Sequence, residues 1–118
     1  MKSGRTMDLI QIMPGQAEAV AGFLKGLANP SRLLILCLLS QGERSVSDLV
    51  VATSIPQTSM SQHLAKLKAE GIVDFRRQHR TLYYFISHPA VTEIMTVLYG
   101  HFCADEHAKR PPTASVDA

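Results

Sequence analysis

The chain has 118 residues, of which 46% are hydrophobic and 19% charged, a size and composition typical of one globular domain and not of a disordered or disulfide-dense chain. Its formal net charge is only +2, so the overall charge identifies no partner. The longest apolar run, Leu33–Leu39, is far shorter than the ~18 residues of a membrane span. The basic start, Met1–Arg5, is followed by no apolar stretch of the kind found in signal peptides. We therefore expect a cytoplasmic protein with no membrane partner.

Helical spacing of apolar residues predicts two helices in the first third of the chain. Pro14 is well placed in the first turn of one helix, and residues 1–12 before it are expected to form an N-terminal extension. Asn29 is a candidate N-cap for the second helix, and Pro30 suits its first position. That helix, residues 31–41, is apolar on all sides, which predicts that it is central and buried.

The middle of the chain has the spacing of a helix-turn-helix. A short helix is expected from Ser47 to Ala52, followed by a break at residues 53–56. A longer helix then runs from about Gln57 to Glu70, with its apolar side chains on one stripe. Two helices joined by a turn of this length are typical of DNA-binding proteins.

Two β-prone stretches, residues 72–78 and 82–86, predict a hairpin with residues 79–81 at its charged tip. A last amphipathic helix is expected from Pro89 until it fades near residue 108. Residues 109–118 combine a Pro-Pro pair with small polar residues, which is typical of a disordered tail.

The order of these elements predicts a mainly α (α+β) fold, a winged helix-turn-helix of five helices with a two-stranded β-hairpin wing, over residues 13–108. A lone polar helix would more often be a solvated surface. Here the turn spacing, the hairpin and a local excess of basic residues together favour DNA binding. Short or planar hydrogen-bonding side chains suit base edges, and cations suit phosphates. The candidate DNA-binding residues are Gln57, Thr58, Ser59, Ser61, Gln62, His63, Lys66, Arg76, Arg77 and Arg80.

The chain resembles the ArsR/SmtB family of repressors over about residues 16–103. The resemblance implies a homodimer joined through its first and last helices. It also implies repression by binding an inverted repeat in double-stranded operator DNA, relieved by an inducer. His79 stands at the wing tip where the family often has Gly, and His tolerates a positive φ better than most residues. The matching stretches are residues 27–33, 57–67, 71–73 and 76–84.

Two metal sites of the family lack ligands in this chain. In the first, a Glu-x-Cys-Val-Cys-Asp-Leu pattern, Ser45 and Ser47 replace the thiols, and a neutral hydroxyl is a poor ligand for soft metals. The second needs four ligands for tetrahedral zinc, and only two of its four positions carry one. Those positions are His88, Ala90, His101 and Ala104.

A ligand-rich stretch near the end of the chain is better interpreted as a solvated helix end than as a metal site. It consists of His101, Cys103, Asp105, Glu106 and His107. We therefore expect no metal site and no cofactor.

The two cysteines, Cys37 on the second helix and Cys103 on the last, admit two interpretations. Taken alone, Cys37 would be a small core residue and Cys103 an incidental thiol. As a pair, and with the context Leu36–Leu39, they resemble the persulfide-responsive BigR, SqrR and HlyU subgroup of the family. The resemblance implies that the reduced protein binds DNA. It further implies that persulfide or polysulfide donors link the two cysteines and release it, which would regulate sulfide or persulfide detoxification or related genes.

The expected link between the two cysteines contains inserted sulfur atoms. A disulfide needs Cα atoms within ~7 Å, a limit that thiols on two packed helices, with axes ~8–10 Å apart, can miss. A persulfide extends the attacking group by ~2 Å. Cys103, nearer water and imidazoles, is expected to react first, and Cys37 to complete the link.

Two alternatives to this switch remain open. One is an ArsR-type repressor with inert cysteines that responds to a metal or another ligand. The other is an enzyme, for which Cys103 with His101 or His107 is the only candidate nucleophile and base. Nothing in the sequence indicates a substrate pocket, so we predict no catalytic residue and no enzyme.

Overall fold

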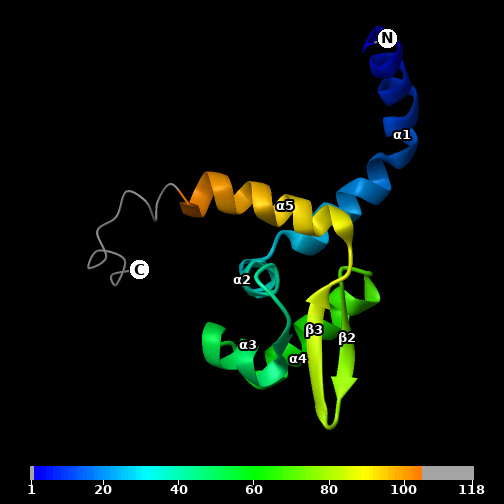
Figure 1. The fold of residues 1–118 in the computed structure, drawn as a ribbon. Helices are drawn as coiled ribbons and strands as arrows, with labels where there is room; N and C mark the ends of the chain where they lie inside the picture. The colour runs from blue at the N-terminus through cyan, green and yellow to red at the C-terminus, as the bar shows by residue number, and fades with distance from the viewer. Residues whose placement is uncertain (1, 105–118) are drawn as a thin grey trace.

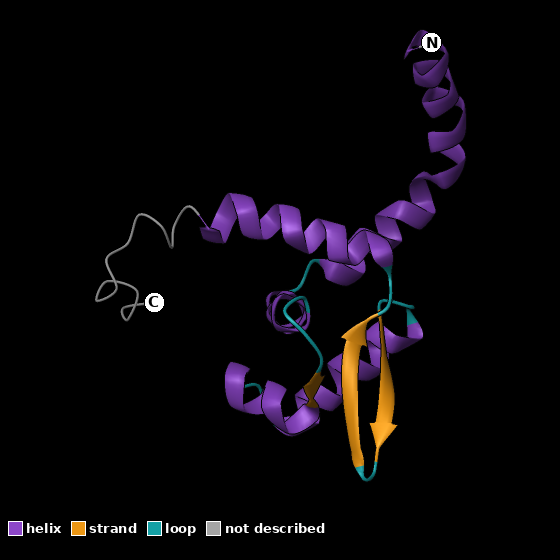
Figure 2. Cartoon of the chain, in the orientation of Figure 1, coloured by secondary structure: helices purple, strands orange, loops and turns teal. Residues whose placement is uncertain are grey.

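The computed structural model describes the backbone of residues 2–104 and the side chains of residues 14–103. Figure 1 shows α2 in the centre, between α5 on one side and the α3, α4 and hairpin layer on the other, and Figure 2 shows the same arrangement by secondary structure. This is the winged helix-turn-helix that the sequence predicted. The elements are α1 (Lys2–Leu27), α2 (Pro30–Leu39), β1 (Arg44–Ser45), α3 (Val46–Thr53), α4 (Gln57–Ala69), β2 (Val73–Gln78), β3 (Thr81–Ile86), α5 (Pro89–Tyr99) and the π-helical turn η1 (Gly100–Ala104).

Helix α1 begins earlier than the sequence predicted. It starts at Lys2 and contains Pro14 in its interior, so the expectation that Pro14 lies in its first turn was wrong. A proline disturbs a helix locally, through its missing N–H and its ring, and the helix can continue beyond it with a bend. The α1 ribbon changes direction along its length in Figure 1. Helix α1 runs without a break past residue 12, so the structure marks no boundary for the extension expected at residues 1–12, which stays a prediction. The tail expected at residues 109–118 lies outside the described residues.

Helix α2 is capped as predicted but is not buried on all sides. The Asn29 side chain accepts a hydrogen bond from the Arg32 backbone N–H at 3.1 Å, and Pro30 occupies the first position. Ile35 and Leu36 are completely buried, whereas Leu34 remains 52% exposed. The neighbouring helices cover one side of α2 and leave the other partly open, so the prediction of an all-round buried helix was wrong for that side.

The helix-turn-helix is held by local caps and one shared core. The Ser45 hydroxyl accepts a hydrogen bond from the Asp48 N–H at 3.1 Å, which caps α3. Ser54, with φ 63°, closes α3 in the left-handed region. One side of α4 is fixed in the core, so its opposite side faces outward. The buried side chains of α4 are Met60, Leu64 and Leu67.

The sheet has the order β1-β3-β2 and is antiparallel. The predicted hairpin pairs Gln78 with Thr81, which leaves a two-residue turn. Within that turn His79 adopts φ 59°, a positive φ of the kind that two-residue hairpin turns require at their first position. The third strand, β1, is only two residues long and was not predicted, because two residues carry no alternation pattern.

A membrane span is not evident from the described helices. No single helix there is long and apolar enough to cross a membrane, although Pro14–Leu27 and α2, which meet at a bend of 85°, pass by length and composition as a pair.

Several large apolar side chains remain exposed on the surface of the monomer. On α1 and α5 they are Val20, Leu24, Val97 and Tyr99.

Candidate functional site

The outward face of α4 carries the candidate base-contacting side chains. Because Met60, Leu64 and Leu67 anchor the helix from the other side, amide and hydroxyl groups are presented on its free surface. Such groups suit the donors and acceptors at base edges in a major groove. Gln57, Thr58, Ser61, Gln62 and Lys66 are exposed, whereas Ser59 and His63 are partly covered.

The three candidate arginines of the hairpin differ in their surroundings. Arg76 is held on the protein by three contacts: its Nε lies 2.8 Å from Glu43 Oε1, its Nη1 donates to Gln78 Oε1 at 2.9 Å, and its guanidinium lies 4.9 Å from the Tyr83 ring centroid. Arg77 and Arg80 are exposed, and the described part of the chain offers them no comparable ion pair. Arg77 and Arg80 are therefore less constrained by the protein than Arg76.

Glu43 and Tyr83 are residues that the sequence analysis missed. Glu43 directly precedes β1, whose Arg44 pairs with Tyr84 of β3, while Arg76 of β2 pairs with Tyr83. The three strands thus bring Glu43 beside Arg76 across 33 positions of sequence. The signal would have been available only if β1 had been predicted.

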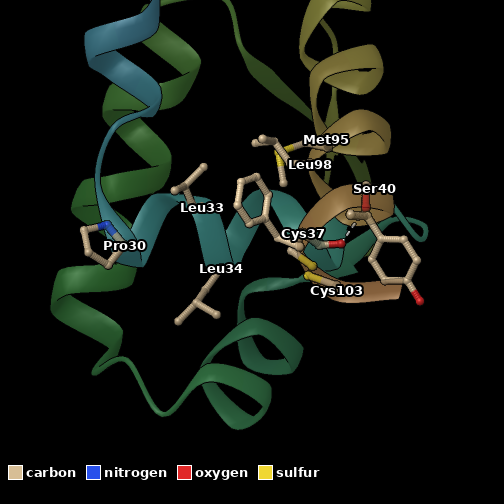
Figure 3. Close-up of a pocket in the computed structure, with 10 residues that line it drawn as sticks. Pro30, Leu33, Leu34, Cys37, Ser40, Met95, Leu98 and Cys103 are labelled. Atoms are coloured by element: carbon tan, nitrogen blue, oxygen red, sulfur yellow. Dashed lines mark hydrogen bonds between the residues drawn. The ribbon is translucent and has the colours of Figure 1, made fainter. Parts of the chain in front are cut away.

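The two cysteines face one groove between α2 and the α5–η1 end of the molecule. The groove has a volume of about 580 Å³, and Figure 3 shows Cys37 and Cys103 pointing toward one another within it. Both are free thiols. The structure thus brings together the pair that the sequence singled out. The other lining residues are Pro30, Leu33, Leu34, Ser40, Met95, Leu98, Tyr99 and Phe102.

The environments of the two thiols differ. Cys37 is partly buried and Cys103 is exposed. Burial, and in second place the charge of a Cys103 thiolate, raise the pKa of the Cys37 thiol. Because the thiolate is the nucleophile, we expect a reagent that arrives from solution to react with the Cys37 thiol less readily than with a free cysteine. Cys103 has the better access.

Cys103 lies on a π-helical turn and not on the uninterrupted helix that the sequence predicted. Helix α5 ends at Tyr99, and the turn η1 runs from Gly100 to Ala104. A π turn holds more residues per turn than an α-helix, so it changes the face on which the following side chains lie. The expected continuation of the helix beyond residue 104 lies outside the described residues.

The described residues contain no group of three or more His, Cys, Asp or Glu side chains that could hold a metal ion. His88 instead caps α5, since its Nδ1 accepts a hydrogen bond from the Ala90 N–H at 3.1 Å. Its ring packs against Phe23, with centroids 4.9 Å apart. Asp105, Glu106 and His107 lie outside the described residues.

Comparison with known proteins identifies the family. Residues 29–74 match the model of the bacterial regulatory protein, arsR family. The biofilm growth-associated repressor of Agrobacterium fabrum is 40% identical over 94 residues, which cover 80% of each chain. The chain belongs to the ArsR family.

Two solved structures of this ArsR-family fold support the predicted subgroup and architecture. Reduced HlyU from Vibrio cholerae is similar with a TM-score of 0.75 at 34% identity, over 79% of this chain and 98% of that chain. The homodimeric winged helix-turn-helix DNA-binding domain Mb0332 from Mycobacterium bovis is similar with a TM-score of 0.66 at 36% identity, over 84% and 90%. The predicted resemblance to the HlyU-containing subgroup is confirmed.

Proposed function

We propose that this ArsR-family regulator is a homodimeric, dithiol-based repressor. It binds operator DNA while Cys37 and Cys103 are reduced, and it is released when reactive sulfur species join them. The observation that carries the proposal is the shared groove, in which thiols from α2 and η1 face one another. A regulator of this kind acts on chromosomal DNA in the cytoplasm, on genes of sulfide or persulfide detoxification or related processes.

Dimer formation is supported by apolar side chains that the monomer leaves exposed. Val20 and Leu24 on α1 and Val97 on α5 are between 37% and 57% exposed, and none of them lines the groove. Such surface is typical of protein interfaces. A two-fold dimer presents two α4 helices to an inverted repeat whose half-sites lie about one helical turn apart.

DNA binding uses the two surfaces already described. Side chains of α4, with Gln62 near the middle of the helix, contact base edges in the major groove. Arg77 and Arg80 of the wing contact phosphates and fix the orientation without selecting sequence. Arg76 joins them only when it leaves Glu43.

The switch begins at Cys103, which is exposed. Its thiolate takes the outer sulfur of one persulfide and releases a thiol, and the resulting Cys103 persulfide takes a second sulfur in the same way. The Cys37 thiolate then attacks the middle sulfur and displaces hydrogen sulfide. Two thiols and two persulfides thus give one trisulfide link, two thiols and one hydrogen sulfide, so the persulfides are the oxidant and no other is needed.

The link changes the protein by tying α2 to the end of α5. Helix α2 packs in the core beside the DNA-binding layer, whereas α5 belongs to the proposed dimer interface. A covalent bond between them couples the α4 helices of the two subunits to their interface. We propose that this resets their relative angle and weakens operator binding.

Intact mass spectrometry of the reduced protein tests the link. Glutathione persulfide should add one or two sulfur masses less two hydrogens per chain, and either Cys37→Ser or Cys103→Ser should abolish this product. Hydrogen peroxide, which inserts no sulfur, should not yield it. A plain disulfide that forms equally well with both reagents would overturn the inserted-sulfur step. Full induction in cells by the double Cys→Ser variant would overturn the dithiol switch and favour an ArsR-type repressor with inert cysteines.

A further inference from the structure

The groove around the two thiols is almost entirely apolar. None of its ten lining residues is charged, in the part of the chain that the structure describes. Its polar side-chain groups besides the thiols are few: the Ser40 hydroxyl donates to the Cys37 carbonyl oxygen at 2.6 Å, and Tyr99 contributes one phenol. A volume of about 580 Å³ lies within the ~300–1,000 Å³ range of small-molecule sites.

We propose that this groove binds the organic part of the inducer and selects uncharged, apolar carriers of sulfane sulfur, such as dialkyl polysulfanes. The inference rests on the dithiol switch and adds its substrate class. The free energy of an alkyl group falls when it moves from water into an apolar groove. The carboxylates and ammonium groups of a glutathione-type carrier would lose water there without gaining an ionic partner.

A dialkyl trisulfide is a complete reagent for the link. The Cys103 thiolate attacks the central sulfur, a sulfur–sulfur bond breaks, and one alkanethiolate leaves and takes up a proton. The Cys37 thiolate attacks the same sulfur atom and displaces the second alkanethiolate. Two cysteine thiols are oxidised to one trisulfide link, and the carrier is reduced to two alkanethiols.

A small carrier fits this groove better than a helix of a second subunit. Figure 3 shows the two thiols among the lining side chains, so a helix seated there would cover the atoms that must react. The exposed apolar residues assigned to the dimer, Val20, Leu24 and Val97, lie outside the groove lining. Tyr99 and Phe102, which are 47% and 69% exposed, do line the groove. The proposal therefore places the dimer interface on α1 and on the Val97 side of α5, and leaves Tyr99 and Phe102 to the carrier.

Two symmetric trisulfides that deliver the same central sulfur atom provide the test. Dipropyl trisulfide and glutathione trisulfide yield the same protein product, which is about 30 Da heavier than the reduced chain. The rate of its formation is followed by intact mass spectrometry on the folded, full-length protein. The ratio of the two rates is divided by the same ratio for N-acetylcysteine. Burial of one propyl group predicts a corrected preference for the dipropyl carrier of roughly 10- to 50-fold.

A charge placed in the groove provides the matched variant. Leu34 lines the groove and is 52% exposed, and Val51 on α3 is 81% exposed and lies outside it. Leu34→Lys should slow the dipropyl carrier and accelerate the glutathione carrier, which lowers the corrected preference at least about fivefold by supplying an ionic partner. Val51→Lys adds the same charge elsewhere and should leave the preference unchanged.

The possible outcomes separate the two proposals. If glutathione persulfide links the thiols and neither trisulfide does, the dithiol switch stands and the carrier class proposed for the groove is wrong. If none of the three reagents links them, the dithiol switch itself is wrong. If both carriers link the thiols and the corrected preference is near one, the switch stands and the groove does not select between carriers. A groove filled by a second subunit would give the same result. A preference that Leu34→Lys leaves intact likewise overturns selection by the groove.

Discussion

Replacing Glu43 by Gln should strengthen DNA binding, although it removes an ion pair. In the structure Glu43 Oε1 lies 2.8 Å from Arg76 Nε, in strand β2 of the wing that we propose contacts phosphates. Glutamine keeps the shape of the side chain and removes its charge. The Arg76 guanidinium can then turn from the protein to a phosphate, to which its planar fork is suited.

The expected magnitudes follow from the exposure of the pair. The Arg76 and Glu43 side chains are 47% and 39% exposed, and pairs of this kind contribute only about 0–1 kcal/mol to stability. The free energy of unfolding should therefore change little. Each additional phosphate contact steepens the slope of log affinity against log salt by about 0.9, so one contact per subunit should steepen it by about two for the dimer. At roughly 0.1 M salt this corresponds to a five- to tenfold gain for each contact.

Fluorescence anisotropy with duplex DNA over a salt series measures both the affinity and the slope. The matched control is the double variant Glu43→Gln with Arg76→Gln, which removes the same negative charge but leaves no guanidinium to contact a phosphate. Its slope should equal that of the unmodified protein. The reasoning would be refuted by a Glu43→Gln slope equal to that of the unmodified protein, or by equal slopes for the two variants.

Three further predictions concern the dimer, the wing and the thiols. Leu24→Glu, at a side chain 49% exposed in the monomer, should give monomers in sedimentation velocity, whereas Val51→Glu on α3 should leave the dimer intact; a dimeric Leu24→Glu protein would place the interface elsewhere. His79 has φ 59°, so His79→Val should lower the free energy of unfolding in urea by about 1–2 kcal/mol and His79→Gly should not; equal stability of the two variants would contradict the strain argument. Because burial and the Cys103 thiolate raise the pKa of Cys37, its alkylation rate should reach half-maximum at a higher pH than that of free cysteine. Cys103→Ser should lower that midpoint only partly, and a midpoint at or below that of free cysteine would refute this account.

Local signals in the sequence predicted most of the fold. Asn29 and Pro30 mark the start of α2 by cap chemistry that acts over three residues. The β-branched and aromatic composition of residues 72–78 and 82–86 predicted the hairpin. The tolerance of His79 for positive φ made its place in the turn acceptable, but did not predict the turn type. Each of these features depends on neighbours in the chain, which is why the sequence reveals them.

The features that the sequence did not reveal depend on contacts between distant segments or on small geometric differences. The two-residue strand β1 exists only because β3 pairs with it, and Glu43 meets Arg76 only through that pairing. The π turn at Gly100–Ala104 has the composition of an ordinary helix end. The apolar groove beside Cys37 could not be predicted, because the sequence does not show which side of α2 the neighbouring helices leave uncovered.

DNA binding by the purified, linked protein tests the central claim most directly. The reduced dimer selects a duplex from a random pool, and its affinity for that duplex is then compared with that of the protein in which Cys37 and Cys103 have been joined. The account predicts at least about tenfold weaker binding by the linked form, a change that lies within the usual range of allosteric coupling. It also predicts full recovery with dithiothreitol and no loss for persulfide-treated Cys37→Ser or Cys103→Ser protein. Equal affinities of the linked and reduced forms would contradict the account.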